Sequence, residues 1–319
     1  MILSYMDSEI SDKEFELMVD QEHFERVWEI INTNINDYVV SYLDEIIQSN
    51  ENSLKPQATL SLYIKNIINE HCKVQDKYSA IFDPELMEEY EEDVDGFKGS
   101  ILKHQCQVIQ RTLNSRSEAL KDWKIAFKLA TPQQLYDTFY NMISFAEDYD
   151  ADIREEELKD IDTIEAIKFA QMSEDACYLI GVIGTGILST ILNAIYPRIF
   201  PGRFKIGMFA LYMISGKKPI DMGSNSSEFL MVKDTIKSKT GTIEQEHNYY
   251  FPYETFALYS LRIYRFLDQI IYKKYNIKFP DDYRYVLVND FYEYMINSNK
   301  TIIQTLLGND DKYKFELPM

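Results

Sequence analysis

Between Ala176 and Lys205 the chain reads ACYLIGVIGTGILSTILNAIYPRIFPGRFK, and its first 22 residues, up to Pro197, carry no charge although 27% of the chain is charged. Leu, Ile and Val point in most directions around a helix drawn through this run. Small and polar residues repeat along one line at every fourth position, at Gly181, Thr185, Ser189 and Asn193. A helix that is apolar on nearly all sides lies inside a larger core or spans a membrane. We predict a central, buried helix over residues 176–196, with a small-residue face that lets a second helix approach closely.

A membrane span is the competing interpretation of the same run, because about 20 apolar residues are long enough to cross a bilayer. Three glycines, two threonines, a serine and an asparagine keep its hydrophobicity at the borderline. About 120 residues of ordinary amphipathic sequence follow it, and no second segment of this kind exists in the chain. The order of its glycines, G-x-x-G-x-G, also differs from the dinucleotide-binding order. These observations favour the buried helix.

The rest of the chain has helical periodicity and few strand signals. Apolar residues recur at spacings of three and four over residues 22–49, and further helices are expected from Pro56, over 101–130 and from Thr131-Pro132. We therefore predict an all-α, multi-helix bundle or array with little or no β structure. A predicted boundary near Ala130 divides it into an N-terminal helical domain, 1–130, and a C-terminal one, 131–319, built around the 176–196 helix.

Composition sets the expected compartment and the class of partner. The chain has 319 residues, is 45% hydrophobic and carries a net charge of −19, which disfavours wholesale binding to nucleic acid or to anionic membrane. Its three cysteines are widely spaced, and the N-terminal sequence MILSYMDSEISDKEF has no basic n-region. We expect a soluble cytoplasmic protein, and its Ile-, Asn-, Lys- and Tyr-rich composition is typical of a bacterial or phage coding sequence.

The basic residues gather locally in this acidic chain. Residues 196–239 hold eight Lys or Arg against three acids. Five of the eight follow the apolar run most closely, and they form the candidate binding set: Arg198, Arg203, Lys205, Lys217 and Lys218. One interpretation is that these bases pair with acidic segments of the same molecule. The other is an anion-binding loop, for phosphate, nucleotide or nucleic acid, because arginines in a Pro/Gly turn beside a helix start suit anions.

No motif for catalysis, a metal or a cofactor stands out. The DYDAD segment begins like an EF-hand loop, but Ile153 and Lys159 occupy the positions of the loop glycine and the bidentate glutamate. No C-x-x-C pair supports a zinc site. If the protein is an enzyme, Glu246 and His247 beside the basic loop are the candidates for acid–base roles. We expect no cofactor and no metal.

The functional expectation is therefore a protein-interaction module or complex subunit, with residues 196–239 as its basic recognition surface and another protein as its partner. The alternative is an enzyme that acts on a phosphate-bearing substrate or nucleic acid through the same loop, with Glu246 and His247. Membrane attachment through 178–196 is the third and least favoured possibility.

Overall fold

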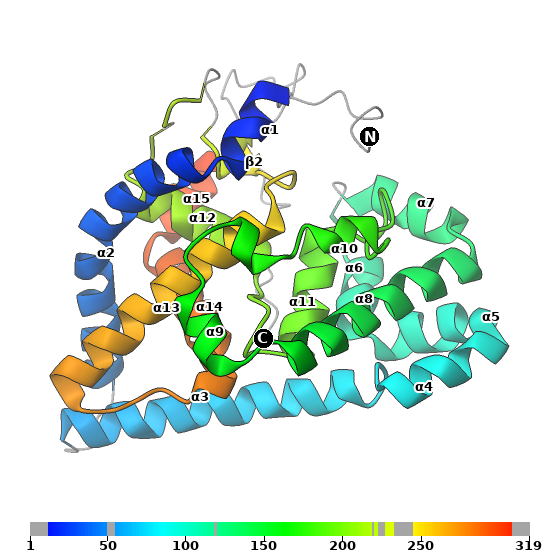
Figure 1. Cartoon of the computed structure of the whole chain (residues 1–319), viewed down its shortest axis with the longest axis horizontal. Helices are drawn as coiled ribbons and strands as arrows, with labels where there is room; N and C mark the ends of the chain where they lie inside the picture. The colour runs from blue at the N-terminus through cyan, green and yellow to red at the C-terminus, as the bar shows by residue number, and fades with distance from the viewer. Residues whose placement is uncertain are drawn as a thin grey trace.

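The computed structural model confirms the all-α prediction (Figure 1). It describes residues 12–49, 55–117, 120–218, 220–222, 227–232 and 245–307. Within these ranges the only sheet is a two-stranded antiparallel one, in which β1 (Leu230–Val232) pairs with β2 (Gln245–His247). Leu230 faces His247 and Val232 faces Gln245 across this pair. All other regular structure in the described residues is helical.

The N-terminal helices follow the apolar periodicity of the sequence. After α1 (Asp12–Val19), α2 spans Gln21–Gln48, and its N-cap Asp20 accepts a hydrogen bond from the backbone N–H of His23. Its buried face carries the apolar residues at helical spacing, from Phe24 to Ile46. The long α3 (Pro56–Ser79) begins with proline at the first helical position, as predicted. It runs along the lower edge of the molecule in Figure 1.

Short elements occupy the middle of the chain. They are α4 (Pro84–Glu89), η1 (Tyr90–Asp93), α5 (Val94–Gly96), the π-helical η2 (Phe97–Gln105), α6 (Gln107–Asn114) and α7 (Lys121–Leu129). The continuous helix predicted over 101–130 is therefore wrong. Cys106 has an extended backbone, and Ser115 leaves the helix with ψ of 143°. The long α8 (Pro132–Asp152) follows, and a capping box between Thr131 and Gln134 fixes its start.

The predicted 176–196 helix is shorter than expected. Residues 153–184 form α9 (Glu155–Asp160), η4 (Glu165–Ile167), α10 (Gln171–Glu174) and a tight turn in which Leu179 pairs with Ile183. The helix itself, α11, covers only Thr185–Ile195. Ala176 and Gly181 have φ angles of 53° and 74°, in the left-handed region that ends a right-handed helix. Of the three glycines of this run, Gly181 serves the turn, Gly184 is the N-cap of α11 and Gly186 lies in its first turn.

The core centres on α12 (Phe204–Ile214), which is buried along almost its whole length and directly follows α11. It contacts α2, α11 and α14 (Arg284–Ser298), and α14 in turn packs on α13 (Tyr253–Tyr275). A short η5 (Asp281–Tyr283) precedes α14, and α15 (Lys300–Leu306) follows it. In the part of the chain that the structure describes, no helix is both long and apolar enough to cross a membrane. The division into 1–130 and 131–319 stays a prediction.

Candidate binding groove

A groove of about 1030 Å³ opens between α8 and the segment 153–176, which we call the strap. Apolar side chains of both elements form its floor, at Phe145, Tyr149, Ile153, Ile161 and Ala166. Tyr149 is half-buried, and its Oη donates a hydrogen bond of 3.0 Å to the carbonyl of Ile167. This bond joins α8 to the strap, so the groove is part of the folded structure.

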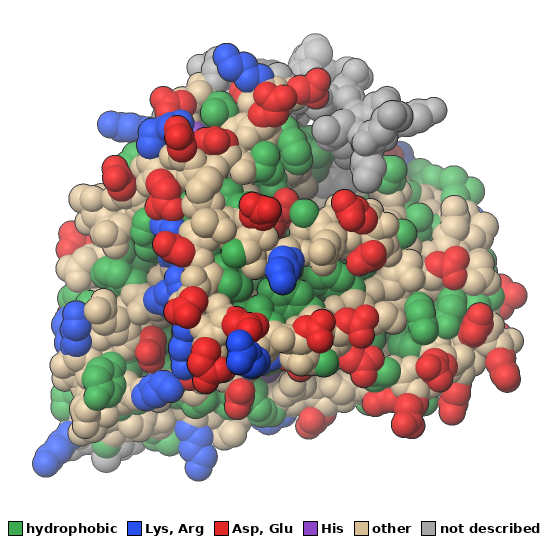
Figure 2. Space-filling view, viewed as in Figure 1, with side chains coloured by type: hydrophobic (Ala, Val, Ile, Leu, Met, Phe, Trp, Pro, Cys, Tyr) green, Lys and Arg blue, Asp and Glu red, His purple; other side chains and the backbone are tan. Residues whose placement is uncertain are grey.

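Carboxylates dominate the polar lining of the groove. Five are exposed there, at Asp148, Asp152, Glu157, Glu174 and Asp175, and the one cation in the lining is Lys168. Glu157 is already paired with Arg154 of the strap, at 2.6 Å. Figure 2 shows acidic side chains around this part of the surface, with a Lys or Arg among them. A hollow with an apolar floor and an acidic rim matches a cationic, amphipathic ligand, because each kind of surface then meets its complement.

The DYDAD segment lies in the last turns of α8, which places its aspartates differently from those of a calcium loop. Asp148 and Asp152 are four residues apart on one helical face and both line the groove. Asp150 contacts Arg198 instead. Among the described residues, no group of three or more His, Cys, Asp or Glu side chains is arranged to hold a metal ion.

Two arginines of α13 hold the strap from behind. One NH2 group of Arg265 donates to the carbonyls of Leu158, Lys159 and Ile161, at 3.2, 2.6 and 2.6 Å. Arg262 contacts both the carboxylate and the carbonyl of Asp162, at 2.8 and 3.0 Å. The carbonyls of Leu158 and Lys159 belong to the last turn of α9 and those of Ile161 and Asp162 follow it, where a helix leaves its last acceptors without intrahelical partners. The arginines satisfy them and fix the path of the strap.

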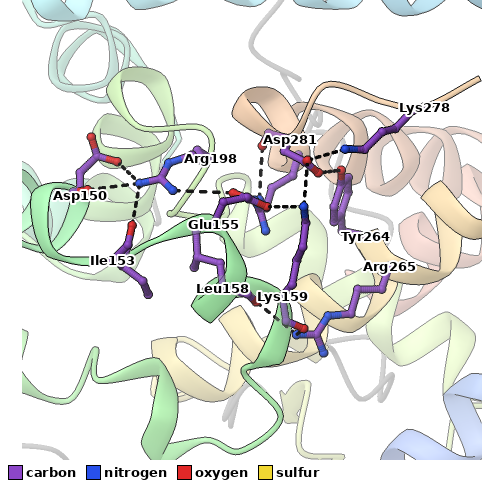
Figure 3. A network of polar contacts seen from close by, with 11 residues as sticks. Asp150, Ile153, Glu155, Leu158, Lys159, Arg198, Tyr264, Arg265, Lys278 and Asp281 are labelled. Atoms are coloured by element: carbon purple, nitrogen blue, oxygen red, sulfur yellow. Dashed lines mark hydrogen bonds and ion pairs between the residues drawn. The ribbon is translucent and has the colours of Figure 1, made fainter.

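Glu155, at the start of α9, links the strap to α14 and to the loop between α11 and α12 (Figure 3). Its carboxylate accepts hydrogen bonds of 2.5 Å from Arg284, a fully buried guanidinium with 1% exposure. Lys159 lies 3.5 Å and Arg198 lies 3.7 Å from the same carboxylate. Arg198 also donates to Asp150 at 2.7 Å and to the carbonyl of Ile153 at 3.3 Å. The network therefore fixes the strap at its junction with α8.

Asp281 extends this network toward α13. Burial alone would raise the pKa of its carboxyl, but hydrogen bonds from Lys278, Tyr264 and Lys159 lower the pKa to about 2. The group is therefore ionised at all physiological pH values, and it holds Lys159 of α9 close to the start of α14.

The structure places the predicted binding residues in two classes. Arg198, Arg203 and Lys205 each pair with a carboxylate of the same chain: Arg203 lies 2.9 Å from Glu293, and Lys205 lies 3.4 Å from Glu246. Lys217 and Lys218 are exposed. Lys218 lines a smaller hollow of about 480 Å³ together with Asn34 and Asp221. The bases 233, 237 and 239 lie outside the described residues.

The candidate catalytic pair, Glu246 and His247, lies on β2. The Nδ1 atom of His247 is 3.6 Å from the Glu246 carboxylate, which is too long for a hydrogen bond. Burial lowers the pKa of His247, although Glu246 acts in the opposite direction. Lys205 brings one cation of the basic loop to this pair. The three residues therefore lie near one another, and the catalytic role of Glu246 and His247 stays a prediction.

Sequence reasoning missed a buried acid beside a buried histidine. Glu228 and His23 are almost completely buried, and 3.8 Å separates His23 Nε2 from the Glu228 carboxylate. Burial raises the pKa of Glu228 to about 8 and lowers that of His23. The two residues are 205 positions apart in the chain, so spacing alone could not have paired them.

Comparisons with protein-family models, with curated proteins and with solved structures found no match. The groove and the charge network are therefore the observations from which a function has to be argued.

Proposed function

We propose that this protein is a protein-interaction subunit that binds a cationic, amphipathic segment of its partner in the groove between α8 and the strap. The single observation that carries the proposal is the pairing of an apolar floor with five exposed carboxylates in one hollow of about 1030 Å³. Apolar burial supplies affinity, and charge complementarity supplies selection and a fast approach.

The fixed strap supports this proposal. Arg198, Arg265 and Arg284 hold its backbone and Glu155 in place before any partner arrives. A surface that is already ordered loses less conformational entropy on binding, so more of the contact energy appears as affinity. The groove needs no large rearrangement to receive a ligand.

The groove is a better-supported surface than the basic loop at 196–239. Three of the five predicted cations, Arg198, Arg203 and Lys205, are already engaged with carboxylates of this chain. An anion would have to compete with those carboxylates. Arg198 holds the strap through its contacts with Asp150, Glu155 and Ile153. This agrees with the interpretation that the bases pair with acidic residues of the same molecule.

We place the protein in the cytoplasm, where such a partner would have to be present. Cys72, Cys106 and Cys177 are all free, and the last two are buried. Free thiols are typical of reducing compartments.

The test is binding of a fluorescent cationic peptide, with Lys and Leu at helical spacing, measured by fluorescence anisotropy. Asp148→Lys with Glu174→Lys reverses two groove charges, and Glu91→Lys with Glu92→Lys is a matched control in an acidic run that does not line the groove. Two lost ion pairs should weaken binding about two- to thirtyfold. Equal affinities of the groove variant and the control variant for the peptide would refute the proposal.

A further inference from the structure

A second part of the molecule is basic, although the chain as a whole carries a net charge of −19. Residues 97–130, which include η2, α6 and α7, hold seven Lys or Arg against two acids. We call the described residues of this segment, 97–117 and 120–130, the basic arm. Its exposed cations include Lys103, Arg116, Lys121 and Lys128. Such a patch on an acidic protein creates a local field of the opposite sign.

Two of the lysines in the basic arm have a structural role. Lys98 donates to the carbonyls of Lys128 and Ala130, which end α7, and Lys124 donates to the carbonyl of Ser115 in the link between α6 and α7. A cation at these carbonyls stabilises the end of a helix. The basic arm is therefore held in a defined shape, and its remaining cations are presented on a fixed scaffold.

The basic arm also exposes a group of large apolar side chains. Ile125 and Leu129, one turn apart on α7, are 50% and 76% exposed. The turn before α11 packs on α7. Trp123 Nε1 donates a hydrogen bond of 2.7 Å to the carbonyl of Val182, and Gly181 lies against Ala126. Ile180 of this turn is 65% exposed. Figure 2 shows hydrophobic side chains grouped where Figure 1 places α7.

We propose that the basic arm of one copy of this chain binds in the acidic groove of a second copy. The inference rests on the proposed function, because it names the partner that the groove receives. The basic arm offers what the groove lacks: exposed cations for Asp148, Glu174 and their neighbours, and the side chains of Ile125 and Leu129 for the apolar floor. The complementarity holds for both kinds of surface.

The exposed apolar residues decide between a protein and a nucleic acid as the occupant of the basic arm. A phosphate backbone would match Lys121 and Lys128 but would leave Ile125 and Leu129 against water. The net charge of −19 also repels a long polyanion. A second copy removes apolar surface from water while it pairs charges. Each copy carries both surfaces, so two copies related by a twofold axis can form the contact twice.

The experiment is sedimentation velocity of the full chain across the micromolar range, at low and at high salt. Lys121→Glu with Lys128→Glu reverses the basic arm, Asp148→Lys with Glu174→Lys reverses the groove, and Lys65→Glu with Lys77→Glu on α3 is the matched control. Circular dichroism establishes that each variant is folded. We expect wild type and control to associate at low salt, with affinity at least about tenfold weaker in either single-surface variant.

Two further samples make the test sharper. Mixing the arm variant with the groove variant should restore a heterodimer, because one intact arm then meets one intact groove. A second arm variant, Ile125→Ser with Leu129→Ser, keeps the charge and should also weaken association. Association that none of these changes alters would overturn the inference.

The outcomes separate this inference from the proposed function. If the chain stays monomeric while the cationic peptide binds the groove, the groove serves a different protein and the self-association is wrong. If neither occurs, both proposals fail. If the wild type is monomeric but binds duplex DNA, and the Lys121→Glu, Lys128→Glu variant does not, the basic arm is a nucleic-acid surface and the inference is overturned.

Discussion

Removing Glu155 should destabilise the protein more than removing Arg284, although the two side chains form one ion pair. Glu155→Ala leaves the guanidinium of Arg284, which is 1% exposed, without its carboxylate. Among the residues that the structure describes, the Asp281 carbonyl at 3.3 Å and the ring of Tyr264 at 5.3 Å would still contact it. Arg284→Met instead leaves Glu155, which is one quarter exposed and still has Lys159 and Arg198 nearby.

The expected magnitudes follow from this asymmetry. Loss of one partner from a buried ion pair costs about 3–5 kcal/mol, because a charge stays buried without compensation. Arg284→Met should cost about 1–2 kcal/mol, since water and two other cations solvate Glu155 and the methionine fills most of the vacated volume. The double variant should cost less than the sum of the single ones by at least about 1 kcal/mol.

Urea unfolding, followed by far-ultraviolet circular dichroism, gives the three free energies. Glu70→Gln, which breaks the exposed pair with Lys73, is the control and should leave the unfolding midpoint unchanged. If Glu155→Ala costs no more than Arg284→Met, or if the two costs simply add, Glu155 is not the group that compensates the buried charge. The account of how the strap is held would then be wrong.

Two further predictions concern packing and pH. A Cβ at Gly207 would lie 2.5 Å from Cε2 of Phe256, so Gly207→Ala should lower the free energy of unfolding by about 1–3 kcal/mol, measured by thermal unfolding. The control is Gly186→Ala in α11, where an added Cβ meets no atom within 4 Å, and it should leave the stability unchanged or raise it. Because burial raises the pKa of Glu228 to about 8, the folded chain binds more protons than the unfolded chain between that value and the usual 4.5, and stability is lost as pH rises through this window. In the wild type the free energy of unfolding should fall by about 1.4 kcal/mol per pH unit from this group, and Glu228→Gln should abolish that dependence. Urea titrations from pH 5 to 8 measure it, and the same slope in the variant and the wild type would contradict the assignment.

Helix type and helix starts could be predicted because local chemistry specifies them. The apolar spacing over 22–49 corresponds to α2 within one residue at each end. Pro56 marks a helix start through its fixed φ angle, and Thr131 marks another through its side-chain cap. Each of these effects reaches only a few residues along the chain. Sequence features that act only on neighbouring residues can be interpreted without knowing the tertiary structure.

The interruptions could not be predicted in the same way. The 176–184 run is as apolar as a buried helix, and it is the left-handed Ala176 and Gly181 that turn the chain. Over 101–130 the periodic apolar residues suggested one helix, although Cys106 and Ser115 leave helical geometry there. Tertiary contacts stabilise the chain at these places: Trp123 donates to the Val182 carbonyl in the first turn, and the N–H of Val108, just after Cys106, donates to the hydroxyl of Tyr78.

The candidate site depends on which charges meet across the fold, and net charge along the sequence does not contain that information. The base excess at 196–239 is visible in the sequence, but Arg198 meets Asp150 and Glu155, which lie 48 and 43 residues earlier. The groove arises because the end of α8 and the strap together have two faces. One face, at Glu155 and Asp162, is neutralised by buried arginines, and the other, at Asp148 and Glu174, stays exposed over an apolar floor. Acids that are paired inside a protein fix its structure, whereas exposed acids over a hollow are accessible to a ligand, and only the fold separates the two sets.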